Sequence, residues 1–134
     1  MKKVLGERKL CLICMEEHEV DKVEVIDTEI FKDQEVAFTA TYEYCSNAEE
    51  FLEAEAMIKA NSLAYRRKAG LLTSGEIISI REKYGVSQKD FSEILNWGGA
   101  TIARYESHQV QSRVHDDVLR KIDEDPKWFL EMLK

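Results

Sequence analysis

The chain has 134 residues, of which 44% are hydrophobic, and a net charge of −7; this length suits one ordinary domain or two small ones. No apolar run approaches the roughly 18 residues that a membrane-spanning helix needs, and the N-terminal segment lacks the apolar centre of a secretion signal. The three cysteines include a Cys11-x-x-Cys14 pair, which argues against a secreted disulfide framework. We therefore expect a cytoplasmic protein with no membrane partner.

The charge is divided unevenly along the chain. Residues 1–60 carry 15 acidic and 7 basic side chains, whereas residues 61–121 carry 7 acidic and 10 basic ones. An acidic surface is repelled by nucleic-acid phosphate, so we expect the basic part to face DNA and the acidic part to serve a protein partner. The alternative is that the acidic side chains only solvate the surface.

Residues 1–52 are predicted to form a small β-rich domain. Val36, Phe38 and Ala40 begin a run in which apolar residues occupy every second position, the pattern of a half-buried strand. An upstream β-rich run, residues 20–31, is separated from it by the polar segment 32–34, so the two runs predict a hairpin. A two-stranded hairpin is only marginally stable alone, and we expect a metal ion to hold this domain together.

Cysteines supply the candidate metal ligands. Cys11 and Cys14 form one close pair, and Cys45 follows the predicted second strand. Structural zinc takes four ligands, usually as two close pairs, but the position that would complete the second pair is Ala48. The sequence thus presents three zinc ligands, with His18 as one conceivable fourth. A redox enzyme built on the cysteine pair would need a thioredoxin-like βαβ setting, which the sequence lacks, so we expect no enzymatic activity.

A helix is predicted over residues 53–70, where apolar residues recur at helical spacing. It should link the β-rich domain to a C-terminal helical domain, residues 71–134. There, Thr73 followed three residues later by Glu76 is a capping box that starts a helix. Gly85 supplies the left-handed residue that ends this helix.

The next two helices are separated by a tight turn. Ser87 with Asp90 caps the first of them, and residues 96–99, Asn-Trp-Gly-Gly, form the turn. The periodicity of the following helix turns Ile102 and Tyr105 to the core, and its opposite face carries Ala100, Thr101 and Arg104. A small residue permits close approach to DNA, a threonine meets a thymine methyl or a base edge, and an arginine pairs with guanine in a bidentate way. The alternative is an ordinary helical bundle with a solvated arginine.

Two further helices are predicted after this one. Leu119 and Ile122 mark the first, and Asp125 as N-cap with Pro126 at the first helical position starts the second. The chain as a whole is therefore predicted to be α+β. It should consist of a β-hairpin unit like a zinc ribbon, a linking helix and a five-helix domain.

The segment from Val86 to Glu106 closely resembles the Cro/repressor-type (XRE) helix-turn-helix. Its Val-Ser-Gln-Lys-Asp-Phe start and its Ala-Thr-Ile-Ala-Arg-Tyr-Glu end match the typical positions of that family. The resemblance implies contact with DNA phosphate by Ser87, Gln88 and Lys89. It implies base readout by Ala100, Thr101 and Arg104, and it gives Glu106 a structural role facing inward. It also implies a homodimer, paired through the late helices, on a palindromic operator with half-sites about one DNA turn apart.

A wider resemblance covers nearly the whole chain. An N-terminal Cys-x-x-Cys with a β-hairpin, a second cysteine turn, a linking helix and an XRE domain form the layout of the MqsA family of type II antitoxins. In that family the N-terminal zinc domain binds the toxin, and the C-terminal domain dimerises and represses the operon. This chain departs from the family at Ala48, where a zinc cysteine is expected, and at Ala100, where asparagine is typical.

The wider resemblance implies a sequence-specific transcriptional repressor that is the antitoxin of a type II toxin–antitoxin module, with zinc as the candidate cofactor. The expected partners are double-stranded operator DNA, the cognate toxin and a second copy of the chain. The alternative is a stand-alone or phage-type repressor whose N-terminal domain senses a ligand or a metal.

Overall fold

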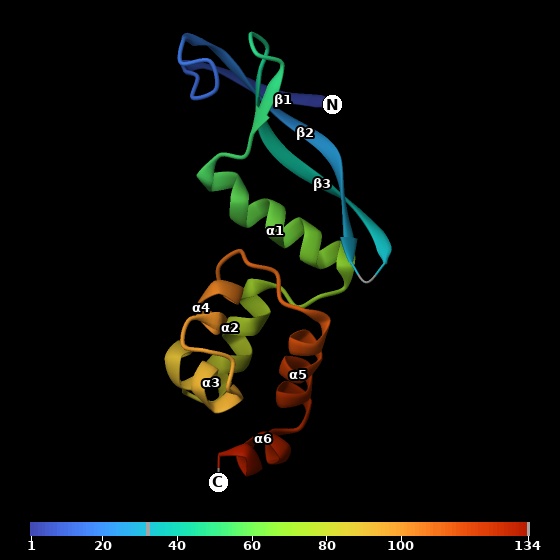
Figure 1. The fold of residues 1–134 in the computed structure, drawn as a ribbon, viewed down its shortest axis with the longest axis vertical. Coiled ribbons are helices and arrows are strands. Elements are labelled where there is room, and N and C mark those ends of the chain that lie inside the picture. The colour runs from blue at the N-terminus through green and yellow to red at the C-terminus, as the bar shows by residue number, and fades with distance from the viewer. Residues whose placement is uncertain (32, 134) are drawn as a thin grey trace. The chain divides into compact units, whose positions relative to one another are not determined.

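The computed structural model describes residues 1–31 and 33–133, and the chain forms two compact units, Met1–Ala69 and Gly70–Lys134. Over the described residues the fold is α+β: a four-stranded antiparallel sheet is followed by six helices (Figure 1). Lys32 of the predicted hairpin connection and Lys134 at the end of the predicted C-terminal domain lie outside the described residues. No described helix has both the length and the apolar character needed to cross a membrane.

The first unit is built on a sheet with the strand order β1-β2-β3-β4. The strands are β1 (Lys2–Leu10), β2 (Glu17–Phe31), β3 (Gln34–Cys45) and β4 (Glu50–Leu52). The prediction of a two-stranded hairpin is therefore wrong in extent, because β1 and β4 extend the β2–β3 hairpin on both sides. The sequence pattern does not predict β1, because β1 is an edge strand that is exposed along almost its whole length and shows no alternation of buried residues.

The long β2–β3 hairpin has one face against a helix and one face open to solvent. Phe38 and Ala40 are buried, whereas Thr39 between them is exposed, which confirms the period-2 pattern predicted for this strand. Ile26 of β2 pairs with Thr39 and is 71% exposed. It therefore belongs to the face that looks away from the helix.

Helix α1 (Glu55–Ala69) packs against β3. Its Tyr65 ring meets Phe38 edge-on, with ring centroids 5.5 Å apart. The buried Asn61 side chain accepts from the Thr41 N–H (2.8 Å) and donates to Thr41 O (2.9 Å), so that a side-chain amide satisfies backbone groups that a neighbouring strand would otherwise pair. The sequence predicts a separate linking helix at residues 53–70, whereas α1 belongs to the same compact unit as the sheet.

The second unit is a bundle of five helices over its described residues. These are α2 (Ser74–Lys83), α3 (Gln88–Leu95), α4 (Thr101–Tyr105), α5 (Arg113–Glu124) and α6 (Pro126–Met132). Their apolar faces meet in one core, whose fully buried side chains include Ile77, Phe91, Ile102, Leu119 and Phe129. This number of helices agrees with the prediction for residues 71–134.

The predicted helix starts are confirmed where a side chain caps them. Thr73 and Glu76 form the expected capping box at α2, and Ser87 accepts from the Asp90 N–H at 3.0 Å. Asp125 caps α6 by accepting a backbone N–H at 3.1 Å. Each cap pairs N–H groups that the first turn of a helix leaves without an intrahelical partner.

A buried carboxylate fastens α5 to the segment before α2. Asp116 is fully buried, and its oxygens accept from the Leu72 N–H (2.8 Å), Gln111 Nε2 (3.0 Å) and Arg120 Nε (2.8 Å). Burial acts to raise the pKa of Asp116, but these hydrogen bonds and the Arg120 charge outweigh burial, so the pKa is lowered. The fold therefore stabilises the ionised carboxylate.

Acid is expected to destabilise this unit through Asp116. Because the folded-state pKa lies below the unfolded value of about 3.9, the stabilisation is fully present above that value and is lost as the pH falls through the folded pKa. Urea unfolding at neutral and decreasing pH should show a smaller pH dependence in Asp116→Asn. Asp117→Asn, exposed on the same helix, is the matched control, and the same pH dependence in both variants would contradict the assignment.

Candidate metal centre and nucleic-acid interface

Four potential metal ligands meet at one end of the sheet: Cys11, Cys14, His18 and Cys45. Their ligand atoms all lie within 4.8 Å of one another. Cys11 and Cys14 lie in the turn between β1 and β2, His18 lies near the start of β2, and Cys45 is the last residue of β3. Antiparallel pairing brings the start of β2 beside the end of β3, which explains why residues far apart in the sequence converge.

The His18 ring is oriented for ligation. Its Nδ1 lies 2.8 Å from the carbonyl oxygen of Glu19, and a carbonyl oxygen can only accept, so Nδ1 carries the proton. Nε2 is thereby left with a lone pair, and it lies 3.6 Å from Cys45 Sγ. With Zn–S and Zn–N bonds of roughly 2.3 and 2.0 Å, a tetrahedral zinc site places sulfur and nitrogen about 3.5 Å apart, close to this separation. A backbone acceptor on the second ring nitrogen is a usual support of a metal-binding histidine.

Backbone hydrogen bonds shape both cysteine turns. In the first turn, Cys11 O accepts from the Met15 N–H (2.8 Å) and the Cys11 N–H donates to Glu16 O (2.9 Å). In the second turn, the Ala48 N–H donates to Cys45 Sγ at 3.4 Å. The second turn thus directs a donor at the ligand sulfur, although Ala48 itself has no ligand atom.

The surroundings of the cysteines lower the pKa of two thiols, those of Cys11 and Cys14. At Cys14, burial acts to raise the pKa, but hydrogen bonds from the Glu16 backbone and the Asn47 side chain outweigh it. Hydrogen bonds from the backbone of Cys14 and then of Ile13 lower the pKa of Cys11 to about 6. Burial raises the pKa of Cys45, because desolvation penalises the charged form, although a bound cation would stabilise that thiolate. Three sulfur donors and one imidazole suit a tetrahedral ion such as zinc. The four residues can therefore hold such a metal.

His18 stands where it can supply the fourth donor that the cysteine spacing leaves missing. It follows Cys14 by four residues, which is not a standard ligand pair, so sequence spacing alone identifies only the three cysteines. The strand register is the feature that identifies His18 as a candidate ligand. β2 and β3 pair as far as Asp21 and Tyr44, which carries the start of β2 to Cys45.

A second candidate site lies on the helical unit, where a tight turn joins α3 to α4. Asn96 ends α3 in the left-handed conformation (φ 59°), and Gly98 in the turn has φ 87°. Glycine adopts such a conformation without the penalty that a Cβ atom imposes. The turn therefore redirects the chain within a few residues and brings α4 against α3.

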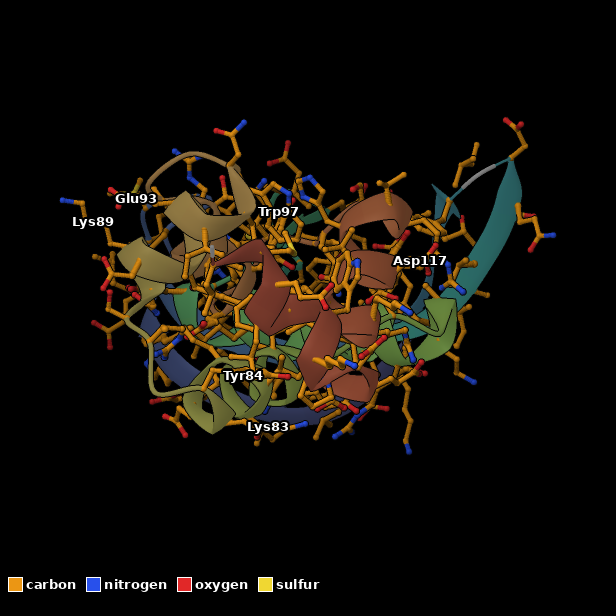
Figure 2. All side chains as sticks on the ribbon, turned by 90° about the horizontal axis from the view of Figure 1, so that it is seen from below. Lys83, Tyr84, Lys89, Glu93, Trp97 and Asp117 are labelled. Atoms are coloured by element: carbon orange, nitrogen blue, oxygen red, sulfur yellow. The ribbon has the colours of Figure 1, made fainter. Side chains whose placement is uncertain are left out.

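The predicted phosphate-contact residues Ser87, Gln88 and Lys89 lie at the start of α3 and are exposed. The Ser87 hydroxyl is engaged as the N-cap of α3. Gln88 Nε2 donates to Glu106 Oε1 at 3.0 Å, which places the start of α3 beside the end of α4. Lys89 projects away from α3 into solvent, as does Glu93 one turn further along (Figure 2).

The predicted base-reading residues differ in exposure. Ala100 and Arg104 are exposed, whereas Thr101 is half-buried. The Thr101 hydroxyl donates to Trp97 O in the turn, so its proton is already used, whereas its methyl group and oxygen lone pairs are not engaged by this bond. Thr101 therefore also secures the start of α4, a role that the sequence pattern does not identify.

An ion pair behind this surface joins α2 to the end of α4. Arg81 Nε and Nη2 donate to the two carboxylate oxygens of Glu106 at 2.7 and 3.0 Å, and only 3% of the Glu106 side chain is exposed. Arg81 also donates to Val86 O at 2.9 Å, and Gln88 reaches the same carboxylate. Glu106 thus connects α2, the start of α3 and the end of α4, which is the structural role predicted for it.

Stacked rings anchor the turn to α5. Trp97 stacks on His115, with ring centroids 3.8 Å apart and planes 13° apart. His115 Nδ1 lies 2.7 Å from the Tyr105 hydroxyl. Burial lowers the pKa of His115, so the ring is neutral near pH 7 and can accept the Tyr105 proton. These contacts hold the turn and α4 in one position.

Comparison with known proteins adds no relative to these observations. No protein-family model, no curated protein and no solved structure matches the chain. What can be inferred about function therefore comes from the two candidate sites and the surfaces around them.

Proposed function

We propose that this chain is a sequence-specific DNA-binding transcriptional repressor whose C-terminal unit reads an operator through α3 and α4. The observation that carries the proposal is the shared carboxylate of Glu106, which ties the start of α3 to the end of α4 while Lys89 and Arg104 stay exposed. Because Glu106 ties α3 to α4, the exposed side chains of these two helices are held in one arrangement relative to each other. A helix of this kind can enter the major groove of DNA.

In this proposal the two helices have different roles. Gln88 and Lys89 contact the phosphate backbone at the start of α3, where Ser87 caps the helix and backbone N–H groups favour an anion. Ala100 permits close approach of α4 to the bases, and Thr101 offers its methyl group to a thymine. Arg104 pairs with the acceptor edge of a guanine.

We assign the metal centre of the first unit to structural zinc. Four protein ligands complete a tetrahedron and leave no open position on the metal, which favours a structural ion over a site that senses a small ligand through its metal. The ligands come from the turn after β1, from β2 and from the end of β3. One ion would therefore hold the ends of three strands together.

The resemblance to MqsA-type antitoxins extends the proposal to a toxin that the first unit binds in the cytoplasm. The excess of acidic side chains in residues 1–60 supports a protein rather than a nucleic-acid partner for this unit. A homodimer is proposed to form through α5 and α6, where Val114, Leu130 and Leu133 are exposed. Two copies would then read the two halves of a palindromic operator.

Arg104→Ala tests the proposed base readout. Loss of a bidentate contact to guanine should weaken operator binding by about 1–3 kcal/mol and relax specificity at one base pair. Fluorescence anisotropy with DNA from the chain's own promoter and with random DNA of the same length measures both effects. Lys59→Ala, which removes an exposed charge from α1 of the first unit, is the matched control. Equal losses on promoter and random DNA would show that Arg104 contacts only phosphate.

A further inference from the structure

We infer that an apolar patch on the face of the β2–β3 hairpin opposite Phe38 and Ala40 is the surface through which the first unit binds a cationic protein partner. This inference rests on the proposed partner-binding role of the unit, and it adds the surface and the chemistry of the partner. The surface, called here the open face, consists of Ile26, Thr28, Ile30, Ala37 and Thr39.

The strand register places these five residues together. Ile26 pairs with Thr39 and Thr28 with Ala37, and side chains at every second position of a strand point to the same side of a sheet. All five residues are exposed. The intervening residues Phe38 and Ala40 are buried on the opposite side, in the cluster that includes Tyr65 of α1.

The composition of the open face is unusual for a solvated surface, because antiparallel sheets commonly present polar side chains to water. Ile26 and Ile30 are 71% and 77% exposed, and with Thr28 between them their Cα atoms lie about 13 Å apart. The carboxylates of Asp27 and Glu29 belong to the other side of the strand, where Asp27 accepts from a tyrosine hydroxyl at 2.6 Å. An exposed apolar patch with polar surroundings marks an interaction surface.

The negative charge around the open face indicates the charge of the partner that binds there. Residues 17–55 carry 13 acidic and 2 basic side chains. Glu35, paired with Ile30, and Glu24, paired with Thr41, lie on the same side of the sheet as the open face and border it. This charge opposes the pairing of open faces from two copies, because like charges would be brought together, and it attracts a cationic protein. The occupant is therefore a basic protein that presents an apolar patch.

The experiment titrates the full-length chain with the product of the gene next to its own, the partner that the antitoxin proposal names, by calorimetry. We expect Ile26→Lys and Ile30→Lys each to weaken binding by at least about 30-fold, because each loses an apolar anchor and adds a repelling charge. Val4→Lys is the matched control: Val4 is 45% exposed on the same unit but lies outside the open face. Its affinity should stay within about threefold of wild type, and thermal unfolding establishes that all variants fold.

Glu35→Gln provides a second measurement that does not depend on an apolar side chain. It should slow association at low salt and have little effect at high salt, since salt screens exposed charges. Unchanged binding by both isoleucine variants, or a loss confined to Val4→Lys, would overturn the inference. No binding by the wild-type chain would overturn it too, whereas operator binding, measured separately, decides the DNA-binding proposal. A dimer that Ile30→Lys converts to a monomer would assign the open face to a second copy instead.

Discussion

Replacing His18 by glutamine is expected to remove zinc from the first unit and to destabilise its sheet. Glutamine keeps a polar side chain but has no imidazole nitrogen, so only the three cysteines would remain as ligands. Loss of a residue that only hydrogen-bonds a metal ligand lowers metal affinity roughly 10- to 100-fold. Loss of the ligand itself should therefore lower the zinc affinity by more than about 100-fold. Because binding to such a site contributes directly to folding free energy, the thermal unfolding of this unit should shift to lower temperature.

Elemental analysis after dialysis against a chelator measures this effect, together with thermal unfolding with and without added zinc. His115→Gln is the matched control, because His115 is also half-buried but lies on the helical unit; it should retain zinc like the wild type. Equal retention of zinc by His18→Gln and wild type would exclude His18 as the fourth ligand. Wild-type protein that holds no zinc after purification would exclude the structural zinc itself.

Replacing Glu106 by alanine is expected to destabilise the helical unit by about 3–5 kcal/mol, the effect of removing one partner from a buried ion pair. Arg81 would keep its charge with only 16% of its side chain exposed. Gln88 would lose its acceptor at the start of α3. Operator binding should fall together with stability, because the start of α3 and the end of α4 would no longer share a support.

Urea unfolding and promoter binding of Glu106→Ala should be compared with those of Glu82→Ala, an exposed glutamate of α2 that should change stability by less than about 0.5 kcal/mol. The double variant Arg81→Met/Glu106→Leu should recover much of the stability, since apolar residues can replace a buried ion pair. It should not recover operator affinity, because Gln88 still lacks its acceptor. Stability of Glu106→Ala equal to that of Glu82→Ala would contradict the assigned role.

Features that depend on neighbouring residues could be predicted from the sequence. The capping box of Thr73 and Glu76 and the cap of Ser87 lie within one helical turn, so local chemistry specifies where α2 and α3 begin. The burial of Ile102 and Phe38 follows equally from the periods of a helix and a strand. The helical unit was predicted well for this reason, including the inward-facing role of Glu106.

The extent of the sheet could not be predicted in the same way. β1 is an exposed edge strand, so no alternation of apolar residues marks it, and β4 has only three residues. Edge strands are held by backbone pairing with a neighbour rather than by a buried face. Their existence therefore depends on β2 and β3 being present beside them.

By itself the sequence determined the α+β class, the helix starts and the alternation in β3, because each depends on residues close together along the chain. The residue type alone identified the three cysteines of the candidate metal centre. Only the tertiary structure decided that His18 joins Cys45, that Asp116 is the buried acceptor of three donors, that the Thr101 hydroxyl is used in the turn, and that Ile26 and Ile30 face solvent. These features depend on strand register and helix packing, which bring together groups separated by many residues. The periodicity of neighbouring residues carries no information about contacts between residues far apart in the sequence.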